Sequence, residues 1–424
     1  MKKRVIGLIL VLALLLSLNA CAEKNSPAEA AGVATSSTSK DEGTVEITYW
    51  HTYDDVVEAA FNEYIIAPFE AMYPNIKVNS IRMPYEGLDE QLVTSVTGDA
   101  APDVVRIDAT WVPQMAKLGA LECLNGYEGF QEIFDKIIDA PKATTVYNGQ
   151  NYGFPLESNT VVAIYNNQTL KEYGFDAPPK TMDELMTALD KTDPANGKYL
   201  FAIQGTYTWA MLPFIWTLGG NITDENYTVA TGYLNSAETV NALDTIATWY
   251  KDGVIGPSIV GSQPDAWGGI GGGNYIMIDE GTWFFSSGFS TDEYTAALLP
   301  SVDGRSISIN GGQDIVMTST SKNKEAAWKF IQFIYGYEQQ AGMATVGMFP
   351  VTTEAIGQVD SSCAAYADVY MAQIQTARNR VPSPNWPSIA TILDTAFEEV
   401  VTGVSTAQDA LDAAAPQIDA LLAQ

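Results

Sequence analysis

The hydrophobic positions in the first part of the chain predict strands and helices in alternation. Residues 45–50 alternate between apolar and polar side chains with period two, as a half-buried strand does, and residues 56–65 repeat at helical spacing. The same criteria predict further strands at 76–78 and 102–107 and further helices at 88–96 and 112–118. This order of elements implies right-handed crossovers and a parallel sheet.

Polar and aromatic residues follow the first and third strands, at the edge of a parallel sheet where ligands bind. Trp50, His51 and Asp54 follow the first strand, and Asp108 and Trp111 follow the third. Two of these residues have a structural alternative. Asp108 binds a ligand or caps the next helix, and His51, the only histidine, touches a ligand or forms a hydrogen bond at the strand end. We predict that all five line a binding site.

The N-terminus has the parts of a secretory signal peptide. Basic residues at 2–4 precede an apolar run over 5–18 that is too short to span a membrane comfortably. Small residues and then Cys21 follow, an arrangement that resembles a bacterial lipobox. Residues 1–20 are therefore predicted to be a lipoprotein signal peptide, and Cys21 to carry the diacylglycerol and palmitate chains. The alternative is an ordinary secretory signal in which Cys21 has no role.

The segment 21–43 predicts a flexible tether. It is rich in Ala, Ser and Thr, and it contains no aromatic residue and no apolar period. With the lipid anchor, it places the folded part on the outer face of the cytoplasmic membrane, an arrangement that favours a Gram-positive source.

Composition limits the size and the partners of the folded part. About 380 residues follow the tether, more than one ordinary domain holds, so two lobes are expected. The formal net charge of −29 excludes nucleic acid as a partner and disfavours anionic ligands, whereas neutral and cationic ligands fit it. Cys123 and Cys363 belong to no CxxC motif and form either one disulfide or two free thiols.

The sequence contains no motif for catalysis or cofactor binding. A single histidine excludes HExxH and three-histidine zinc sites, and the run Gly268–Gly273 lacks the spacing of a phosphate-binding loop. We therefore expect no enzyme activity, no catalytic residue, no cofactor and no metal. A pair of catalytic carboxylates, as in a glycosidase, remains an alternative, because a chain with 51 acidic residues contains many that could form one.

Loose motifs recur in a characteristic order over nearly the whole mature chain: Trp50-His51, Gly98–Val105, Tyr152–Asn159, Ala177–Leu185, Gly281–Trp283 and Asn323–Ile331. In this order they resemble the family 1 extracellular solute-binding proteins, the maltose-binding-protein-like sugar receptors of ABC importers. The resemblance implies a monomer that works with a permease pair and an ATPase.

The same resemblance implies an α/β fold of two lobes, as in periplasmic binding proteins, with a mostly parallel sheet in each lobe and a hinge of several strands. Lobe one is expected at 44–156 plus 309–349, and lobe two at 157–308 plus 350–424. The hinge crossings are expected near 155–159, 305–310 and 349–351. Hinge closure would trap a ligand between the lobes.

The tryptophans favour a carbohydrate ligand. A pyranose has an apolar face and a polar rim, so its receptor needs aromatic rings beside carboxylates or amides. Nine tryptophans are present. Tryptophans in predicted loops are expected to stack on the sugar unless they fill the core. Besides Trp50 and Trp111, these are Trp209, Trp267, Trp283 and Trp386. Helical or apolar patterns assign Trp216, Trp249 and Trp328 to the core.

Polar residues near the expected hinge complete the candidate site. Glu157 lies at the first crossing, Gly312 and Gln313 follow the second, and Arg380 precedes Trp386. Glu157 binds a ligand hydroxyl or holds the hinge, and Arg380 binds the sugar or bridges the lobes.

Three functions stay open from the sequence. A receptor for a sugar or oligosaccharide is favoured. The same fold could instead hold a cationic solute such as a polyamine or peptide, because aromatic boxes also bind cations. The third function, a secreted carbohydrate-active enzyme, would be distinguished by cleavage of an oligosaccharide.

Overall fold

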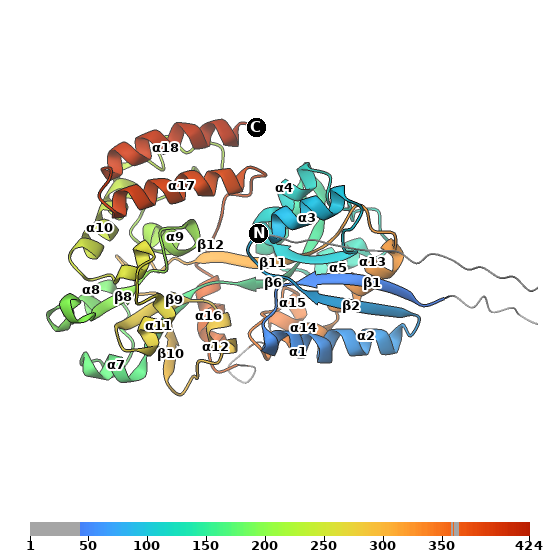
Figure 1. The fold of residues 1–424 in the computed structure, drawn as a ribbon, viewed down its shortest axis with the longest axis horizontal. Helices are drawn as coiled ribbons and strands as arrows, with labels where there is room; N and C mark the ends of the chain where they lie inside the picture. Colours follow the sequence, from blue (N-terminus) through green and yellow to red (C-terminus); the bar gives the residue numbers. More distant parts are fainter. Residues whose placement is uncertain (1–42, 358, 360–363) are drawn as a thin grey trace, which may run out of the picture. The chain divides into compact units, whose positions relative to one another are not determined.

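The computed structural model describes residues 43–357, 359 and 364–424. Two sheets, each covered by helices, organise this part of the chain (Figure 1). We call the part built on the six-stranded sheet lobe one and the part built on the four-stranded sheet lobe two. The predicted signal peptide, Cys21, nearly all of the tether and Cys363 lie outside the described residues. None of the described helices is long and apolar enough to cross a membrane.

The sheet of lobe one has the order β12-β11-β3-β1-β2, and β6 pairs with β11. Its central strands β1, β2 and β3 are parallel, which confirms the prediction for this region. β11 runs antiparallel to β3 and β6 because it re-enters the lobe from lobe two. The strands are β1 (Val45–His51), β2 (Ile76–Arg82), β3 (Val104–Asp108), β6 (Gly153–Asn159), β11 (Ile309–Met317) and β12 (Arg378–Asn379).

Helices cover both faces of this sheet. α1 continues through a π-helical turn, Asn62–Ile66, into α2, so the predicted helix at 56–65 is present and longer than expected. The apolar faces of α1 and α13 pack on β1 around Tyr49 and Phe330. The helices are α1 (Asp55–Phe61), α2 (Ala67–Met72), α3 (Leu88–Thr97), α4 (Val112–Lys117), α5 (Phe130–Lys136), α6 (Asp139–Lys142), α13 (Lys324–Ile334), α14 (Tyr337–Ala344) and α15 (Thr353–Ile356).

The sheet of lobe two, with the order β10-β7-β9-β8, is not mostly parallel as expected. β7 runs antiparallel to both β9 and β10, and only β8 and β9 are parallel. A buried apolar strand has the same pattern in either direction, so its direction depends on the connections. The strands are β7 (Val162–Asn166), β8 (Tyr199–Ala202), β9 (Tyr275–Glu280) and β10 (Tyr294–Ala297).

The helices of lobe two enclose its largest apolar cluster, which includes Trp216 as predicted. α17 and α18 pack against each other at the C-terminal end of the chain (Figure 1). The helices are α7 (Asn167–Glu172), α8 (Met182–Met186), α9 (Thr208–Thr217), α10 (Ala237–Lys251), α11 (Ala266–Gly271), α12 (Trp283–Ser286), α16 (Ala367–Ile374), α17 (Trp386–Val401) and α18 (Ala407–Leu422).

The first two predicted chain crossings lie beside each other, and the first also contacts Phe349. Ser158 pairs with Gly312, and its N–H donates to Phe349 O at 3.3 Å. Thr160 Oγ1 lies 2.7 Å from Ile309 O, which ties the first crossing to the second. A Cβ on Gly312 would lie 2.3 Å from Glu157 O, so this close approach of the strands requires glycine. The first predicted lobe boundary, between 156 and 157, falls inside β6.

Candidate functional site

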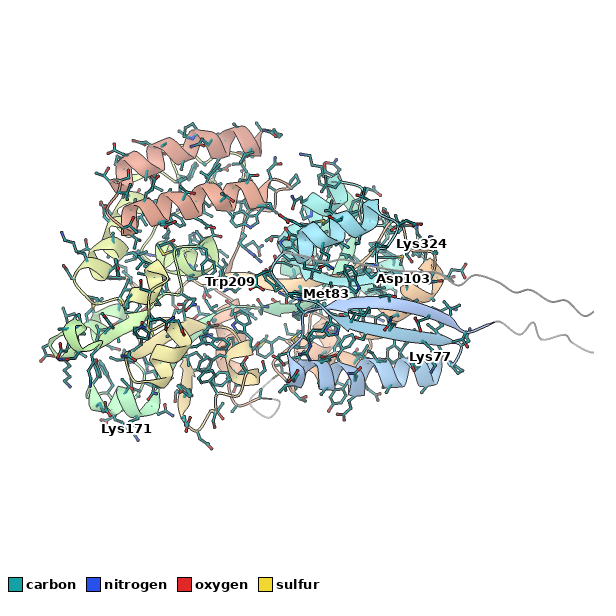
Figure 2. The ribbon with its side chains drawn as sticks, viewed as in Figure 1. Lys77, Met83, Asp103, Lys171, Trp209 and Lys324 are labelled. Atoms are coloured by element: carbon teal, nitrogen blue, oxygen red, sulfur yellow. The ribbon has the colours of Figure 1, made fainter. Side chains whose placement is uncertain are left out.

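A cavity of about 690 Å³ lies between the two lobes and is lined by side chains of both. Trp209 lies on the side of lobe two that faces lobe one (Figure 2). This volume is within the usual range for small-ligand sites. The sequence-predicted residues that line the cavity are Asp54, Asp108, Glu157, Trp209, Trp283, Gly312, Gln313 and Arg380.

Arg106 and Glu157 form a buried ion pair on the lobe-one wall. Arg106 Nη2 lies 2.5 Å from Glu157 Oε1 and 2.6 Å from Gln313 Oε1, and Nη1 donates to Thr52 Oγ1. Burial raises the pKa of Glu157, and the Arg106 guanidinium opposes that shift. The guanidinium also lies over the Tyr53 ring, 4.7 Å from its centroid. These contacts hold the wall in one geometry.

Asp108, at the end of β3, is the second carboxylate of this wall. Oδ1 accepts hydrogen bonds from Thr110 N and Oγ1, and Oδ2 accepts one from Tyr85 OH at 3.0 Å. Arg380 Nη2, from the segment between β12 and α17, lies 3.2 Å from Oδ1. Burial alone would raise the pKa of Asp108, but Arg380 and these donors hold that pKa below its usual range. Asp108 therefore caps the next turn and also forms an ion pair.

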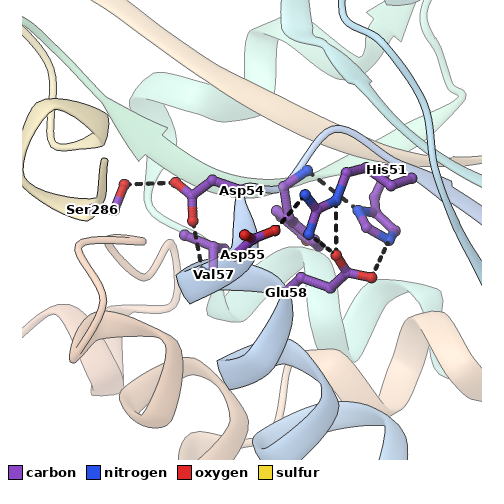
Figure 3. Close-up of polar contacts among 8 residues, drawn as sticks. His51, Asp54, Asp55, Val57, Glu58 and Ser286 are labelled. Atoms are coloured by element: carbon purple, nitrogen blue, oxygen red, sulfur yellow. Dashed lines mark hydrogen bonds and ion pairs between the residues drawn. The ribbon is translucent and has the colours of Figure 1, made fainter. Parts of the chain in front are cut away.

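Asp54 links the two lobes directly (Figure 3). Its Oδ1 accepts the N–H of Val57 at 2.9 Å and so caps α1. Its Oδ2 accepts a hydrogen bond of 2.6 Å from Ser286 Oγ, at the end of α12. One carboxylate thus has a helix cap on one oxygen and a cross-lobe contact on the other.

Two indole rings form the aromatic part of the lobe-two wall. Trp209 lies in the first turn of α9 and Trp283 begins α12, and their ring centroids are 6.1 Å apart. Arg380 lies over the Trp209 ring, 5.2 Å from its centroid. A Cβ on Gly281 would lie 2.2 Å from the Trp283 ring, and one on Gly311 would lie 2.4 Å from the Trp209 ring. Glycine at both positions therefore leaves room for the rings beside the backbone.

Two adjacent carboxyl groups complete the lobe-two wall. Asp279 and Glu280 end β9 and are only 7% and 8% exposed. Glu280 Oε1 accepts a hydrogen bond of 2.6 Å from Trp267 Nε1, and Oε2 accepts the N–H of Gly281. Burial raises the pKa of Glu280 to about 7. Burial, and then the charge of Glu280, raises the pKa of Asp279.

Trp50 and His51 do not line this cavity, contrary to the prediction. β1 extends through His51, and successive side chains of a strand point to opposite faces. His51 is therefore fully buried beside Tyr49 and Tyr53, whereas Trp50 packs against the other face of the sheet. The next residues along the chain, 52–54, reach the cavity instead.

His51 belongs to a polar network next to the site (Figure 3). Its Nδ1 accepts the N–H of Tyr53 at 3.2 Å, and its Nε2 lies 3.8 Å from Glu58 Oε1. Glu58 and Asp55 both pair with Arg82. Burial lowers the pKa of His51 to about 4, so the imidazole is neutral at pH 7. The structural alternative considered for this residue agrees with these contacts.

Three other predicted tryptophans also lie outside the cavity lining. Trp111 packs against Tyr85, which lines the cavity in its place. Trp267 lies behind Glu280 and donates to it. Trp386 is 4% exposed in the core of lobe two, because the proline-rich segment around it begins α17 and is not an open loop.

Sequence reasoning missed several residues that line the cavity, among them Arg106, Tyr85, Asp279, Glu280 and Ser286. The strand-end rule applied to the second sheet would have found Asp279 and Glu280, because they follow the buried run Tyr275–Ile278. Arg106 gave a weaker signal, a charge between the apolar residues Val105 and Ile107 of β3. Among the described residues, no group of three or more His, Cys, Asp or Glu is arranged to hold a metal.

Comparisons with known proteins agree with this architecture. The profile of the family described as bacterial extracellular solute-binding protein matches residues 64–367. The galactooligosaccharide-binding protein of Bacillus subtilis is 24% identical over 441 residues, covering 98% of this chain and 96% of that protein. A solved ABC transporter solute-binding protein from Thermotoga lettingae, bound with α-D-tagatose, is 25% identical with a TM-score of 0.77, covering 89% of this chain and 100% of that one.

The fold is also shared with the GacH receptor of Streptomyces glaucescens, solved in the unliganded form and with acarbose. That receptor is 19% identical with a TM-score of 0.80, covering 90% of this chain and 99% of that one. The predicted two-lobe α/β fold is therefore confirmed, apart from the strand directions in lobe two.

Proposed function

Because the chain belongs to the bacterial extracellular solute-binding proteins, we propose that it captures a sugar or short oligosaccharide between its lobes and delivers it to the permease of an ABC importer. Membership of this family implies an exported protein. The relative named for a galactooligosaccharide and the solved protein bound with α-D-tagatose support the sugar class.

The observation that carries the proposal is the composition of the cavity walls. Trp209 and Trp283 offer aromatic faces for the C–H face of a sugar ring, and carboxylate and amide groups line the same cavity. Both arginines of the cavity already pair with carboxylates, so neither offers an uncompensated positive charge to an anionic ligand. A neutral polyol needs no such charge.

A cationic solute is the second candidate, and one observation favours it. Asp279 and Glu280 line the cavity, and neither forms an ion pair with another described residue. A polyamine or a basic peptide would supply the missing positive charge. An enzyme is the weakest candidate, since the fold and the family are those of binding proteins.

A thermal-shift panel tests these alternatives. The purified protein is heated with neutral mono- and oligosaccharides, with polyamines and with short peptides. A ligand at a hundred times its Kd adds about 2.7 kcal/mol to the free energy of unfolding, which is readily visible. We expect a shift with one family of sugars and no cleavage of the oligosaccharides. A shift with polyamines or peptides alone would overturn the sugar proposal, and the product of a cleaved oligosaccharide would favour the enzyme.

We also propose that the protein is a monomer anchored by lipid at Cys21, with a flexible tether up to residue 43. We further propose that its lobes close about the hinge crossings expected near 155–159, 305–310 and 349–351. Membrane fractionation of cells expressing the full chain tests the anchor. We expect Cys21→Ala to move the protein from the membrane to the soluble exported fraction. An unchanged distribution would contradict lipidation at this cysteine.

A further inference from the structure

The charged groups that line the cavity are not balanced. Arg106 pairs with Glu157 and Arg380 pairs with Asp108, so both cations are already neutralised. Asp279 and Glu280 line the same cavity without a cation among the described residues. The lobe-two wall is therefore acidic, and no described basic side chain compensates it. A buried carboxylate without a counter-charge is costly unless a ligand or a proton compensates it.

Asp279 is the more unusual of the two acids. Glu280 accepts hydrogen bonds from Trp267 and from Gly281, whereas no other described residue donates a hydrogen bond to the side chain of Asp279. Asp279 is nine-tenths buried, and it lines the cavity. Its carboxyl oxygens are not completely enclosed by protein atoms. Its carboxyl group thus faces the space that a ligand would occupy. A charge-compensating partner for it therefore comes from that ligand or from a bound proton.

The aromatic surroundings of these acids suit a cation as well as a sugar face. Trp283 lies only three residues after Glu280 in the sequence, and Trp209 and Tyr207 line the same cavity. An ammonium group gains from the face of an aromatic ring, and this gain grows where water is excluded. A hydroxyl group would supply a hydrogen bond to Asp279, but it would leave the charge uncompensated.

We propose that Asp279 and Glu280 bind a protonated amine and that the preferred ligand is an amino sugar or an oligosaccharide that contains one. This inference rests on the proposed sugar-binding function and adds the chemical group that sets the preference. The amine lies against the two carboxyl groups of lobe two. The hydroxyl groups of the same sugar face the paired charges of lobe one.

Isothermal titration calorimetry at pH 7 with matched sugar pairs tests the inference. The members of each pair differ only in whether they carry free amines: glucose and glucosamine, galactose and galactosamine, and N-acetylated chitosan oligosaccharides and their free-amine forms. We expect the amine to bind at least tenfold more tightly than its neutral counterpart in the pair that fits the cavity. In the Asp279→Asn protein we expect this preference to disappear, because the affinity for the amine falls at least tenfold more than the affinity for the neutral sugar.

Glu280→Gln gives a second variant should Asp279→Asn fail to fold, and Glu90→Gln is the matched control. Glu90 is exposed on α3 of lobe one and is not among the residues that line the cavity, so its substitution removes the same charge away from the site. We expect Glu90→Gln to leave the preference for the amine unchanged.

The outcomes separate the two proposals. If neutral sugars bind and their amino counterparts bind no more tightly, the inference is overturned and the sugar-binding function stands. The same holds if Asp279→Asn weakens both members of a pair equally. If no sugar of either kind binds, the inference and the proposed function both fail.

Discussion

The two walls of the cavity differ in how their charges are satisfied. On lobe one, Arg106 holds Glu157 and Gln313, and Asp108 accepts hydrogen bonds from Thr110 and Tyr85. On lobe two, Glu280 is held only by neutral N–H donors, and the side chain of Asp279 has no donor among the other described residues. The lobe-one wall thus contains two ion pairs, although Glu157 Oε2 and the Nε atoms of both arginines are buried without a hydrogen-bond partner. The lobe-two wall contains no ion pair among the described residues.

This difference separates a rigid frame from a selective surface. Side chains that already form an ion pair keep their geometry and distinguish little between charged and neutral ligands. A ligand that replaces an equally strong partner gains no net binding free energy. Unpaired acids and exposed ring faces gain most from a matching ligand. We therefore expect substitutions in the lobe-one wall to act mainly on folding, and those in the lobe-two wall mainly on binding and on the pH dependence of stability.

The largest effect is expected from breaking the buried ion pair of lobe one. Arg106→Met leaves Glu157, which is 3% exposed, as an unpaired buried carboxyl. Removing one partner of a buried pair typically costs about 3–5 kcal/mol of unfolding free energy. Urea denaturation measures this loss. The double variant Arg106→Met, Glu157→Leu is the control and should recover most of it, because an apolar pair of similar volume replaces the charges. A single-variant loss below about 1 kcal/mol would contradict the described pairing.

The next effect concerns the pH dependence that Glu280 gives to lobe two. Its pKa is raised from 4.5 to about 7, so the folded state holds the proton more tightly than the unfolded state. Stability contributed by this group is therefore present below pH 4.5 and is lost as the pH rises to about 7. Glu280→Gln should raise the unfolding free energy at pH 8 by about 3 kcal/mol and leave it unchanged at pH 4. Urea titrations at the two pH values measure this. A difference that does not vary with pH would show that burial of this carboxyl has no such cost.

A smaller effect is expected when an aromatic face of lobe two is removed. Trp209→Ala should weaken sugar binding about 30-fold, or about 2 kcal/mol, because the ring offers a large desolvated contact surface. The same ring also packs against the guanidinium of Arg380. Calorimetry with the sugar found in the thermal-shift panel measures it. Trp386→Phe is the matched control, since Trp386 lies in the core. The affinity of this variant for the sugar should stay within twofold of that of the unchanged protein. An unchanged affinity in Trp209→Ala would place the sugar elsewhere.

The smallest effect is expected at the contact that joins the two walls. Ser286→Ala removes the hydrogen bond to Asp54 Oδ2 and leaves the helix cap on Oδ1 intact. One hydrogen bond contributes about 1 kcal/mol, so we expect about fivefold weaker binding, mostly through faster dissociation. Stopped-flow release of the ligand measures it. Ser287→Ala changes the exposed neighbour and should have no effect. Equal effects in the two variants would rule out a specific role for the Asp54 contact.

Part of the candidate site could be predicted because strand ends have a recognisable local pattern. Asp54 and Asp108 reach the cavity by this rule. Trp50 and His51 do not, because β1 continues through His51 and its alternation turns these side chains to the two faces of the sheet. Trp267 and Trp386 have loop-like neighbours in sequence, yet both begin or enter helices whose packing decides where the rings lie.

The sequence by itself determined the strands and helices of the first 75 or so folded residues, the parallel order of β1, β2 and β3, and the family. Each of these depends on periodicity or motif order, which are local properties. Only the tertiary structure decided which charges meet: Arg106 with Glu157, Asp108 with Arg380, and Asp54 with Ser286. These partners lie far apart along the chain, and their contact depends on the relative placement of strand ends and helices, which no local pattern encodes.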